Sequence, residues 1–251
     1  MVHFVGAGPG AEDLITLKGA ALLGNAEIVI YTGSLINPGI LGLCQREGTA
    51  IYNSADMSLP QIIDVIRDAD ERGFDVVRLH TGDPALYGAI REQIDELKRL
   101  GIDYEVVPGV SSMGAAAAAI GTEYTLPGVS QTVIVTRLAG RTPVPEAESI
   151  AALSAIGATM VIFLSAGMLK ELSAELLKGA YTEDTPAAIA YKVTHPEEKI
   201  VYTTVGELAE AGAKNGIDHT ALVLVGDFLG HEYELSKLYD PEFETGYRNS
   251  I

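Results

Sequence analysis

The stretch Val2-His3-Phe4-Val5-Gly6-Ala7-Gly8-Pro9-Gly10-Ala11 opens the chain with a short apolar run that leads directly into a glycine-rich turn. A run of this kind, bounded by turn residues, predicts a strand buried in a sheet. Further strands are predicted at 27–31, 75–79 and 103–107, and helices with apolar residues at helical spacing at 59–72 and 84–100. This alternation predicts an α/β domain with a mainly parallel sheet.

The pattern changes near residue 117, where a second series of strands and helices begins. An alanine-rich helix is predicted at 115–119, followed by a connection at 121–128. Later strands are expected at 132–136, 159–164, 187–191, 199–203 and 221–225, and helices at 146–156, 168–177 and 205–214. A hairpin through Thr194-His195-Pro196-Glu197 would make this second sheet mixed. We therefore predict two αβα domains, 1–116 and 117–251, with a cleft between them and a tail from His231 that is either docked or loose.

The charge of the chain limits the partners that it can have. Its 251 residues include 34 Asp and Glu against 17 Lys and Arg, which gives a net charge of −17. Nucleic acid and anionic membranes are therefore not expected as partners, because both are bound through clustered cations. No apolar run is long enough to span a bilayer, and the first residues lack the pattern of a leader, so we expect a cytoplasmic protein.

The cysteine and histidine content argues against several kinds of site. Cys44 is the single cysteine, so no intrachain disulfide can form, and its apolar neighbours predict that it is buried. The five histidines show no metal-binding spacing, and no G-x-S-x-G elbow is present. We therefore expect neither a metal site nor a hydrolase triad.

The segment from Gly6 to Ala11 formally matches G-x-G-x-x-A, the dinucleotide-binding fingerprint. In that fingerprint the loop opens directly into a helix whose N-terminus faces the pyrophosphate. Here Glu12-Asp13-Leu14 intervenes before a helical pattern that begins near Thr16, and its two carboxylates would repel a pyrophosphate. A ligand-facing loop of another kind is favoured, while a structural turn and a nucleotide-dependent oxidoreductase remain alternatives.

Two further glycine-bearing junctions follow predicted strands, at 80–88 and 108–112. Open α/β sheets bind their ligands at the carboxyl ends of such strands. Gly82 would let a ligand lie against the backbone, although Asp83 and Pro84 are equally typical of the first residues of a helix. Three such junctions without a Walker sequence suggest a ligand that is held largely by backbone groups.

These motifs, taken in order, resemble the tetrapyrrole (class III) methyltransferases, which use S-adenosylmethionine. The likeness continues through Ile162–Gly167, Ala188–Lys192 and Ala221–Gly226, and so covers nearly the whole chain. Tyr31–Pro38 and Thr194–Glu198 resemble the group that methylates C11 of precorrin-4 or cobalt-precorrin-4 in cobalamin synthesis. The resemblance implies two domains, often in a homodimer, a tetrapyrrole polycarboxylate as substrate, and S-adenosylhomocysteine as the product of the donor. A sibling that methylates another ring carbon, a diphthine-type protein methylase and a non-catalytic tetrapyrrole carrier remain alternatives.

The resemblance also implies the residues of the donor site, carried over one by one. They are Pro9, Gly82, Asp83, Leu86, Ser111, Ser112, Ala166, Tyr191, Val193, Ala221 and Leu222. Ala166 and Val193 depart from the Met and Gly that relatives often have. No catalytic residue is assigned beyond a possible role for Asp83 beside the cationic donor, because methyl transfer from a sulfonium mainly requires alignment and the exclusion of water.

The carboxylates of such a substrate require cations, and arginine meets carboxylates in pairs. The candidates are Arg137 and Arg141, which follow a predicted strand, together with Lys192 and Arg46. Solvated loop charges are the alternative interpretation of both arginines. The remaining expected substrate contacts are Gly8, Gly10 and Ser34.

Overall fold

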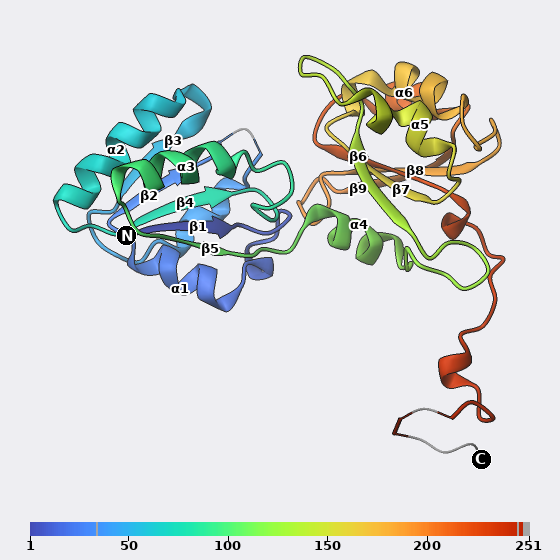
Figure 1. Cartoon of the computed structure of the whole chain (residues 1–251), viewed down its shortest axis with the longest axis horizontal. Coiled ribbons are helices and arrows are strands. Elements are labelled where there is room, and N and C mark those ends of the chain that lie inside the picture. The colour runs from blue at the N-terminus through green and yellow to red at the C-terminus, as the bar shows by residue number, and fades with distance from the viewer. Residues whose placement is uncertain (34, 245, 248–251) are drawn as a thin grey trace. The chain divides into compact units, whose positions relative to one another are not determined.

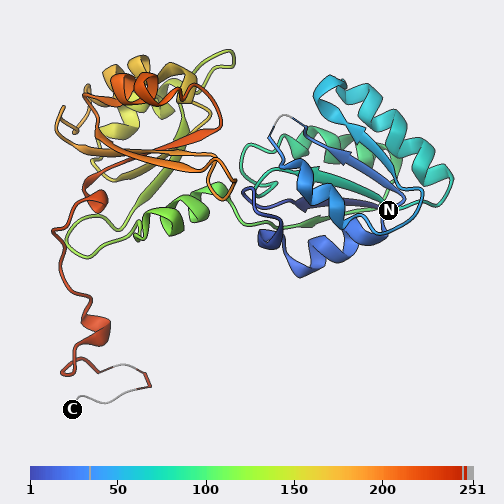
Figure 2. The same cartoon turned by 180° about the vertical axis from the view of Figure 1, so that it is seen from behind.

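The computed structural model describes residues 1–33, 35–244 and 246–247 of the chain, and Figures 1 and 2 trace it from two sides. Its residues fall into two compact units. Unit 1 consists of Met1–Ala116 and the short segment Lys192–Glu198, and unit 2 of Ala117–Tyr191 and the chain from Lys199 onward. The predicted substrate contact Ser34 lies outside the described residues.

Unit 1 contains a five-stranded sheet in the order β3-β2-β4-β1-β5, and every neighbouring pair is parallel. The strands are β1 (Val2–Gly6), β2 (Ile28–Tyr31), β3 (Ala50–Asn53), β4 (Val76–His80) and β5 (Tyr104–Val107). The mainly parallel sheet expected from the sequence is confirmed. The sequence patterns did not predict β3, because this edge strand exposes Ile51, Tyr52 and Asn53 and lacks a buried apolar run.

Helices cover both faces of this sheet, as Figure 1 shows. Helix α1 (Leu17–Asn25) packs on one face, where Val5, Leu23 and Val29 are fully buried. Helices α2 (Leu59–Glu71) and α3 (Ile90–Leu100) pack on the opposite face around Phe4 and Ile66. Because both faces are buried, the central strands are mainly apolar, with His3, Arg78 and His80 as buried exceptions. The short helices η1 (Glu12–Leu14), η2 (Pro38–Leu43) and η3 (Ser54–Asp56) lie in the connections, and α4 (Ser112–Ile120) follows β5.

Unit 2 contains a mixed sheet in the order β6-β7-β10-β8-β9. Its strands are β6 (Val133–Arg137), β7 (Thr159–Phe163), β8 (Pro186–Tyr191), β9 (Lys199–Thr204) and β10 (Ala221–Val225). Strand β6 is parallel to β7, whereas β10 is antiparallel to β7 and β8. Strands β8 and β9 form the predicted antiparallel hairpin, so the mixed sheet is confirmed.

The helices of unit 2 are shorter than the sequence patterns predicted. The expected helix at 146–156 divides into η4 (Glu146–Glu148) and α5 (Ile150–Ser154), because Ser149 is extended and caps the second segment. The expected helix at 168–177 consists of η5 (Ala166–Met168) and α6 (Leu169–Leu176), and α7 (Leu208–Asn215) begins three residues late. All three α-helices contribute to one core with the sheet.

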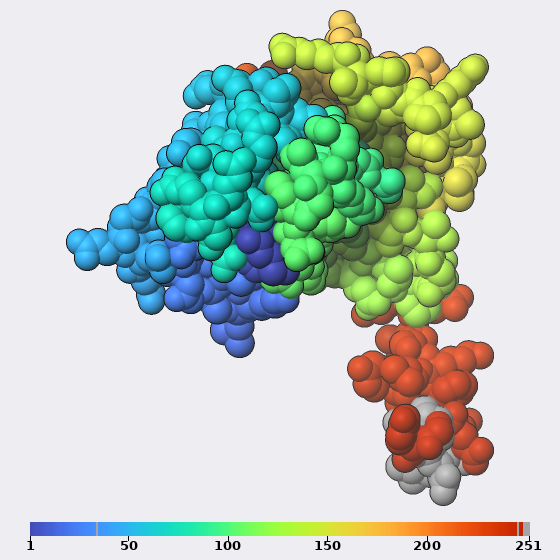
Figure 3. Space-filling model, turned by 60° about the vertical axis from the view of Figure 1, so that its left-hand side comes forward, coloured from blue at the N-terminus to red at the C-terminus, as the bar shows by residue number. Residues whose placement is uncertain are grey.

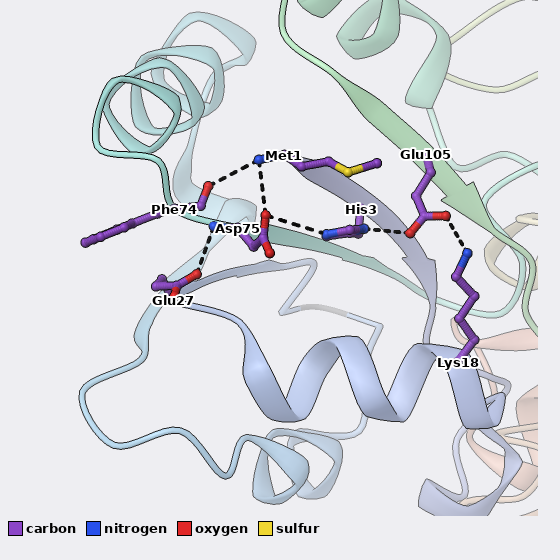
Figure 4. A network of polar contacts seen from close by, with 7 residues as sticks. All are labelled: Met1, His3, Lys18, Glu27, Phe74, Asp75 and Glu105. Carbon is purple, nitrogen blue, oxygen red and sulfur yellow. Dashed lines mark hydrogen bonds and ion pairs between the residues drawn. The ribbon is translucent and has the colours of Figure 1, made fainter.

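A polar network joins the amino ends of three strands in unit 1 (Figure 4). His3 Nδ1 lies 2.8 Å from Glu105 Oε1, and Lys18 forms an ion pair with the same carboxylate. The Lys18 ammonium is the main cause of a lowered pKa at Glu105, with a further contribution from His3. The amino group of Met1 lies 3.2 Å from Asp75 Oδ1. Since ligands of parallel sheets bind at the opposite, carboxyl edge, this network stabilises the sheet rather than forming its site.

Two smaller predictions concern Cys44 and the tail. Cys44 was expected to be buried but is only partly so, because it lies at the margin of the α1 core. Its partial burial raises the pKa of the thiol.

The tail is anchored at Glu234, whose N–H donates to the carbonyl of Pro127 at 3.0 Å. Tyr233, Leu235 and the following apolar side chains are exposed, and Figure 3 shows this segment in red. No described helix is long and apolar enough to cross a membrane.

Candidate functional site

The three glycine-bearing junctions of unit 1 meet at the carboxyl edge of its sheet. Gly82 N donates to Gly8 O at 2.8 Å, and Gly8 N donates to Gly82 O at 3.3 Å, so the loops after β1 and β4 form a two-residue bridge. The loop after β1 leads to α1 on one face, whereas the loop after β4 leads to α3 on the other. This divergence creates a topological switch point, which is where open α/β sheets bind ligands.

Backbone packs directly on backbone where these loops meet. A β-carbon on Gly109 would lie 2.1 Å from the carbonyl oxygen of Gly82, and one on Gly6 would lie 2.5 Å from Gly109 Cα. Only glycine fits at both positions, because the atoms in the way are backbone atoms that cannot rotate aside. These two glycines therefore shape the edge. Gly82 differs from them, because a β-carbon there would come no closer than 3.6 Å to its neighbours, and its φ of 62° is what favours glycine.

Asp83 joins two of the loops through its carboxylate. Its Oδ2 accepts a hydrogen bond from Gly109 N at 2.9 Å, and its Oδ1 accepts one from Ala85 N at 2.8 Å. The alternative that Asp83 and Pro84 begin a helix is wrong, since α3 begins at Ile90. Residues 84–87 form a turn instead, and Tyr87 has a φ of 57° that a right-handed helix cannot contain.

Residues with strained backbone dihedral angles lie close in sequence to the donor contacts that the family resemblance implies. Non-glycine residues with positive φ among the described ones are Tyr87, Ala89, Leu164, Lys192, Thr194 and Thr220. Each lies within three positions of an expected donor contact, namely Leu86, Ala166, Tyr191, Val193 or Ala221. Such conformations cost free energy and concentrate at functional sites. The strain is independent support for these segments, because the dihedral angles play no part in the resemblance.

A turn from the β8–β9 hairpin packs against the glycine loop within unit 1. Ala11 N donates to Thr194 Oγ1 at 2.9 Å, and the imidazole of His195 lies against Gly10. Val193 is buried in this turn. The contact brings Pro9 and Val193, two expected donor residues that are far apart in sequence, into adjoining segments.

Expected donor residues in unit 2 lie at the ends of its strands. Ala221 pairs with Tyr191 in the β10–β8 register, and Leu222 is buried beside them. Ala166 is also buried, directly after Ser165, whose Oγ accepts a hydrogen bond from Leu138 N at 2.9 Å. That bond joins the loop after β6 to the loop after β7.

The cations proposed for the substrate differ in their surroundings. Arg137 donates to the carbonyls of Thr142 at 3.1 Å and Pro143 at 2.7 Å, so its guanidinium holds the loop in which the exposed Arg141 lies. Lys192 Nζ lies 3.8 Å from Glu197 Oε2. Arg46 forms an ion pair with a glutamate that precedes β2, at the amino edge of the sheet and away from the glycine junctions.

Two buried ionisable residues of β4 were not singled out by the sequence analysis. Arg78 donates to Gln93 Oε1 and to the carbonyl of Ile30, both at 3.1 Å, and burial lowers its pKa to about 10. Burial, followed by the charge of Arg78, lowers the pKa of His80 to about 3. His80 Nε2 and Thr81 Oγ1 are buried without hydrogen-bond partners among the described residues. The signal in the sequence was an arginine inside a mainly apolar strand that ends in a histidine.

The family of Tetrapyrrole (Corrin/Porphyrin) Methylases matches residues 1–209. The chain belongs to this family. The family assignment confirms the resemblance seen in the motifs, and it excludes the oxidoreductase alternative for the glycine loop, whose fingerprint is also broken by η1 before α1 begins.

The tetrapyrrole methylase is similar along its whole length to named relatives. It is 50% identical to the cobalt-precorrin-4 C(11)-methyltransferase of Methanocaldococcus jannaschii over 250 residues, which are 99% of this chain and 96% of the relative. The solved structure of a cobalamin biosynthetic enzyme, cobalt precorrin-4 methyltransferase, matches with a TM-score of 0.89 and 45% identity, over 92% of this chain and 96% of that one. This match confirms the predicted fold class.

A second solved structure bears on the donor. It is the uroporphyrin-III C-methyltransferase of Thermus thermophilus complexed with S-adenosyl homocysteine, with a TM-score of 0.74 and 27% identity over 91% of this chain and 93% of that one. In the part of the chain that the structure describes, no group of three or more His, Cys, Asp or Glu is placed to hold a metal ion.

Proposed function

We propose that the protein transfers the methyl group of S-adenosylmethionine to C11 of cobalt-precorrin-4 or of its metal-free form, precorrin-4, in cobalamin biosynthesis. The observation that carries this proposal is the 50% identity, over nearly all of both chains, with the cobalt-precorrin-4 C(11)-methyltransferase of M. jannaschii. The residues of the glycine junctions suit a small ligand held largely by backbone groups.

The described residues fit a donor of this kind. Thr81 Oγ1 and His80 Nε2 are buried orphan polar atoms next to Gly82, and a bound ligand or an ordered water would satisfy them. Asp83 supplies a carboxylate at the same edge, where a cation is favoured. The proposed donor residues are those that the family resemblance implies: Pro9, Gly82, Asp83, Leu86, Ser111, Ser112, Ala166, Tyr191, Val193, Ala221 and Leu222.

Methyl transfer requires the side chains mainly to position the donor and the acceptor. When bound, S-adenosylmethionine supplies an already activated methyl group on a sulfonium, and the carbon nucleophile displaces it in line. The chain must hold donor and acceptor in contact and exclude water, and this positioning alone can account for several kcal/mol of a barrier, roughly 7–11 in favourable cases. The rigid backbone contacts of Gly6, Gly82 and Gly109 provide such placement.

The substrate is a polycarboxylate, so cations are needed in a chain whose net charge is −17. Arg141 is exposed and able to meet a carboxylate, whereas Arg137 is hydrogen-bonded to the carbonyls of its own loop. We assign carboxylate contact to Arg141 and Lys192, and loop support to Arg137, with Gly8, Gly10 and Ser34 as further contacts. Arg141→Ala should therefore raise KM for the tetrapyrrole without changing thermal stability, and Arg137→Ala should lower both stability and activity.

We propose that the enzyme is a cytoplasmic homodimer, in keeping with the family resemblance. The exposed apolar side chains of the tail, among them Tyr233 and Leu235, are available for contacts between copies. Sedimentation equilibrium of the full chain tests the dimer, and a monomer at micromolar concentration would contradict it.

The decisive experiment combines purified protein, S-adenosylmethionine and either cobalt-precorrin-4 or precorrin-4. The expected product carries one additional methyl group by mass, located on C11 by NMR. A new methyl group on another carbon would assign the protein to a sibling activity. Binding of the ring without any change in its mass would make the protein a carrier and overturn the proposal. The rates with the two substrates are compared, and the faster one shows whether the natural substrate already contains cobalt when it binds.

A further inference from the structure

The turn Lys192–Glu198 holds its third residue, Thr194, in a costly conformation. Thr194 has a φ of 66°, in the left-handed region that β-branched residues rarely enter. Strain of this kind, on the order of 1–3 kcal/mol, persists only where surrounding contacts over-determine the conformation. The contacts of Thr194 therefore indicate what the turn is built to hold.

The hydroxyl and the backbone N–H of Thr194 bond to different partners. Its Oγ1 accepts a hydrogen bond from Ala11 N at 2.9 Å, at the end of the glycine loop. Its backbone N–H donates to Glu198 Oε2 at 2.6 Å, within the turn. Ala11 precedes η1, so its N–H has no helical carbonyl to bond. The threonine hydroxyl is thus the link between the turn and the glycine loop.

We propose that Thr194 is a positioning residue that holds the glycine loop Ala7–Ala11 in place against the turn Lys192–Glu198. The inference rests on the proposed function, because the turn carries the donor contact Val193 while the glycine loop carries the donor contact Pro9 and the substrate contacts Gly8 and Gly10. With the link intact, Val193 and the glycines proposed to contact the substrate adopt one arrangement. Without it, the partly buried N–H of Ala11 loses its partner and the loop loosens from the turn.

The test compares two variants of Thr194 with a control in the adjoining strand. Thr194→Val has nearly the same shape and the same β-branching, so it keeps the strain and removes only the hydroxyl, and Thr194→Ser keeps the hydroxyl. Thr203→Val is the control, since Thr203 Oγ1 is buried without a partner among the described residues and its removal breaks no hydrogen bond. Affinity for S-adenosylhomocysteine is measured by calorimetry, and hydrogen exchange of the Ala11 amide by NMR.

Loss of the hydroxyl should weaken S-adenosylhomocysteine binding about tenfold, in line with the cost of leaving a partly buried donor unpaired. Thr194→Ser should stay within about twofold of the wild type, and Thr203→Val should match it. The Ala11 amide should exchange faster in Thr194→Val alone. Binding and amide exchange are measured below the thermal unfolding transition of each variant, so that global unfolding does not contribute to either result.

Two results would overturn the inference. One is a Thr194→Val protein with unchanged affinity and unchanged exchange at Ala11. The other is a Thr194→Ser protein that fails as Thr194→Val does, because the hydroxyl would then not be the group that matters. Failure of the wild type itself to bind S-adenosylhomocysteine would instead contradict the proposed function, while the exchange rate of Ala11 would still decide whether Thr194 holds the loop.

Discussion

The imidazole ring of His195 occupies the space that a β-carbon on Gly10 would need. That carbon would lie 2.2 Å from Cδ2 of the ring and 2.5 Å from Nε2. The carbonyl of Gly10 also accepts a hydrogen bond from Asn37 Nδ2 at 2.9 Å. The glycine is thus required by a side chain 185 positions further along the chain, and not by its own backbone conformation.

Replacement of Gly10 should expose this dependence in a double-mutant cycle. Gly10→Ala should lower the free energy of unfolding by about 1–3 kcal/mol, because the methyl group collides with the ring of His195. In a His195→Ala background the same change should cost much less, since the ring is gone. Denaturant unfolding of the four proteins gives the coupling free energy. Additive costs would show that the clash is relieved in some other way.

Gly109 should tolerate substitution far less well than Gly114, which lies five residues further along the chain in α4. Gly109→Ala places a methyl group against the backbone of Gly82 and Gly6, which cannot move aside, so a loss of more than about 3 kcal/mol is expected. Gly114 lies in α4 with nothing within 4 Å of a β-carbon. Gly114→Ala should stabilise the helix by about 0.5–1 kcal/mol. Thermal unfolding compares the two, and similar effects would contradict the backbone packing described.

Asp83 offers a test of whether its charge or its hydrogen bonds matter. Asp83→Asn places an amide where two backbone N–H groups now meet carboxylate oxygens, so at least one bond is lost and stability should fall by about 1–3 kcal/mol. If the role is to support the loops, affinity for cationic S-adenosylmethionine and neutral S-adenosylhomocysteine should fall equally. Calorimetry with both ligands decides the matter. A loss confined to S-adenosylmethionine would identify the carboxylate as an electrostatic partner of the sulfonium.

His80 should make the protein sensitive to mild acid. Its pKa is about 3 in the folded state against an ordinary value of 6.5, so between these values the unfolded chain binds a proton that the folded chain does not. Stability is therefore fully present above pH 6.5 and falls as the pH is lowered, with a slope of up to about 1.4 kcal/mol per pH unit. Arg78, beside it, remains charged throughout this range.

Urea unfolding between pH 6.5 and 5 measures this slope, in a range above the titration of most carboxylates. His80→Gln should remove the contribution of about one bound proton from the slope of the unfolding free energy against pH. His231→Gln, in the exposed tail, should leave the slope unchanged. An unaltered slope in His80→Gln would mean that water reaches the imidazole in the folded protein.

Local patterns predicted the strands of both sheets well, and predicted the helices less accurately. Apolar runs identified β1, β4 and β10 because a strand buried on both faces is mainly apolar, even though β4 also contains Arg78. Edge strand β3 carries no such run and was missed. The helix expected at 84–100 ends where predicted but begins only at Ile90, because the residues after Pro84 form a loop that Asp83 joins to Gly109. Capping residues act within a few positions, and they do not report a contact 26 residues away.

The sequence by itself determined the fold class, the family and the segments in which the donor contacts are proposed. These follow from periodicity and from motifs in a given order, which are properties of neighbouring residues. Only the tertiary structure decided why particular residues stand there: that Gly10 faces His195, that Thr194 holds Ala11, and that Arg137 holds its own loop. Those relationships join positions distant in the chain, and they are set by the packing of whole elements, which no local pattern encodes.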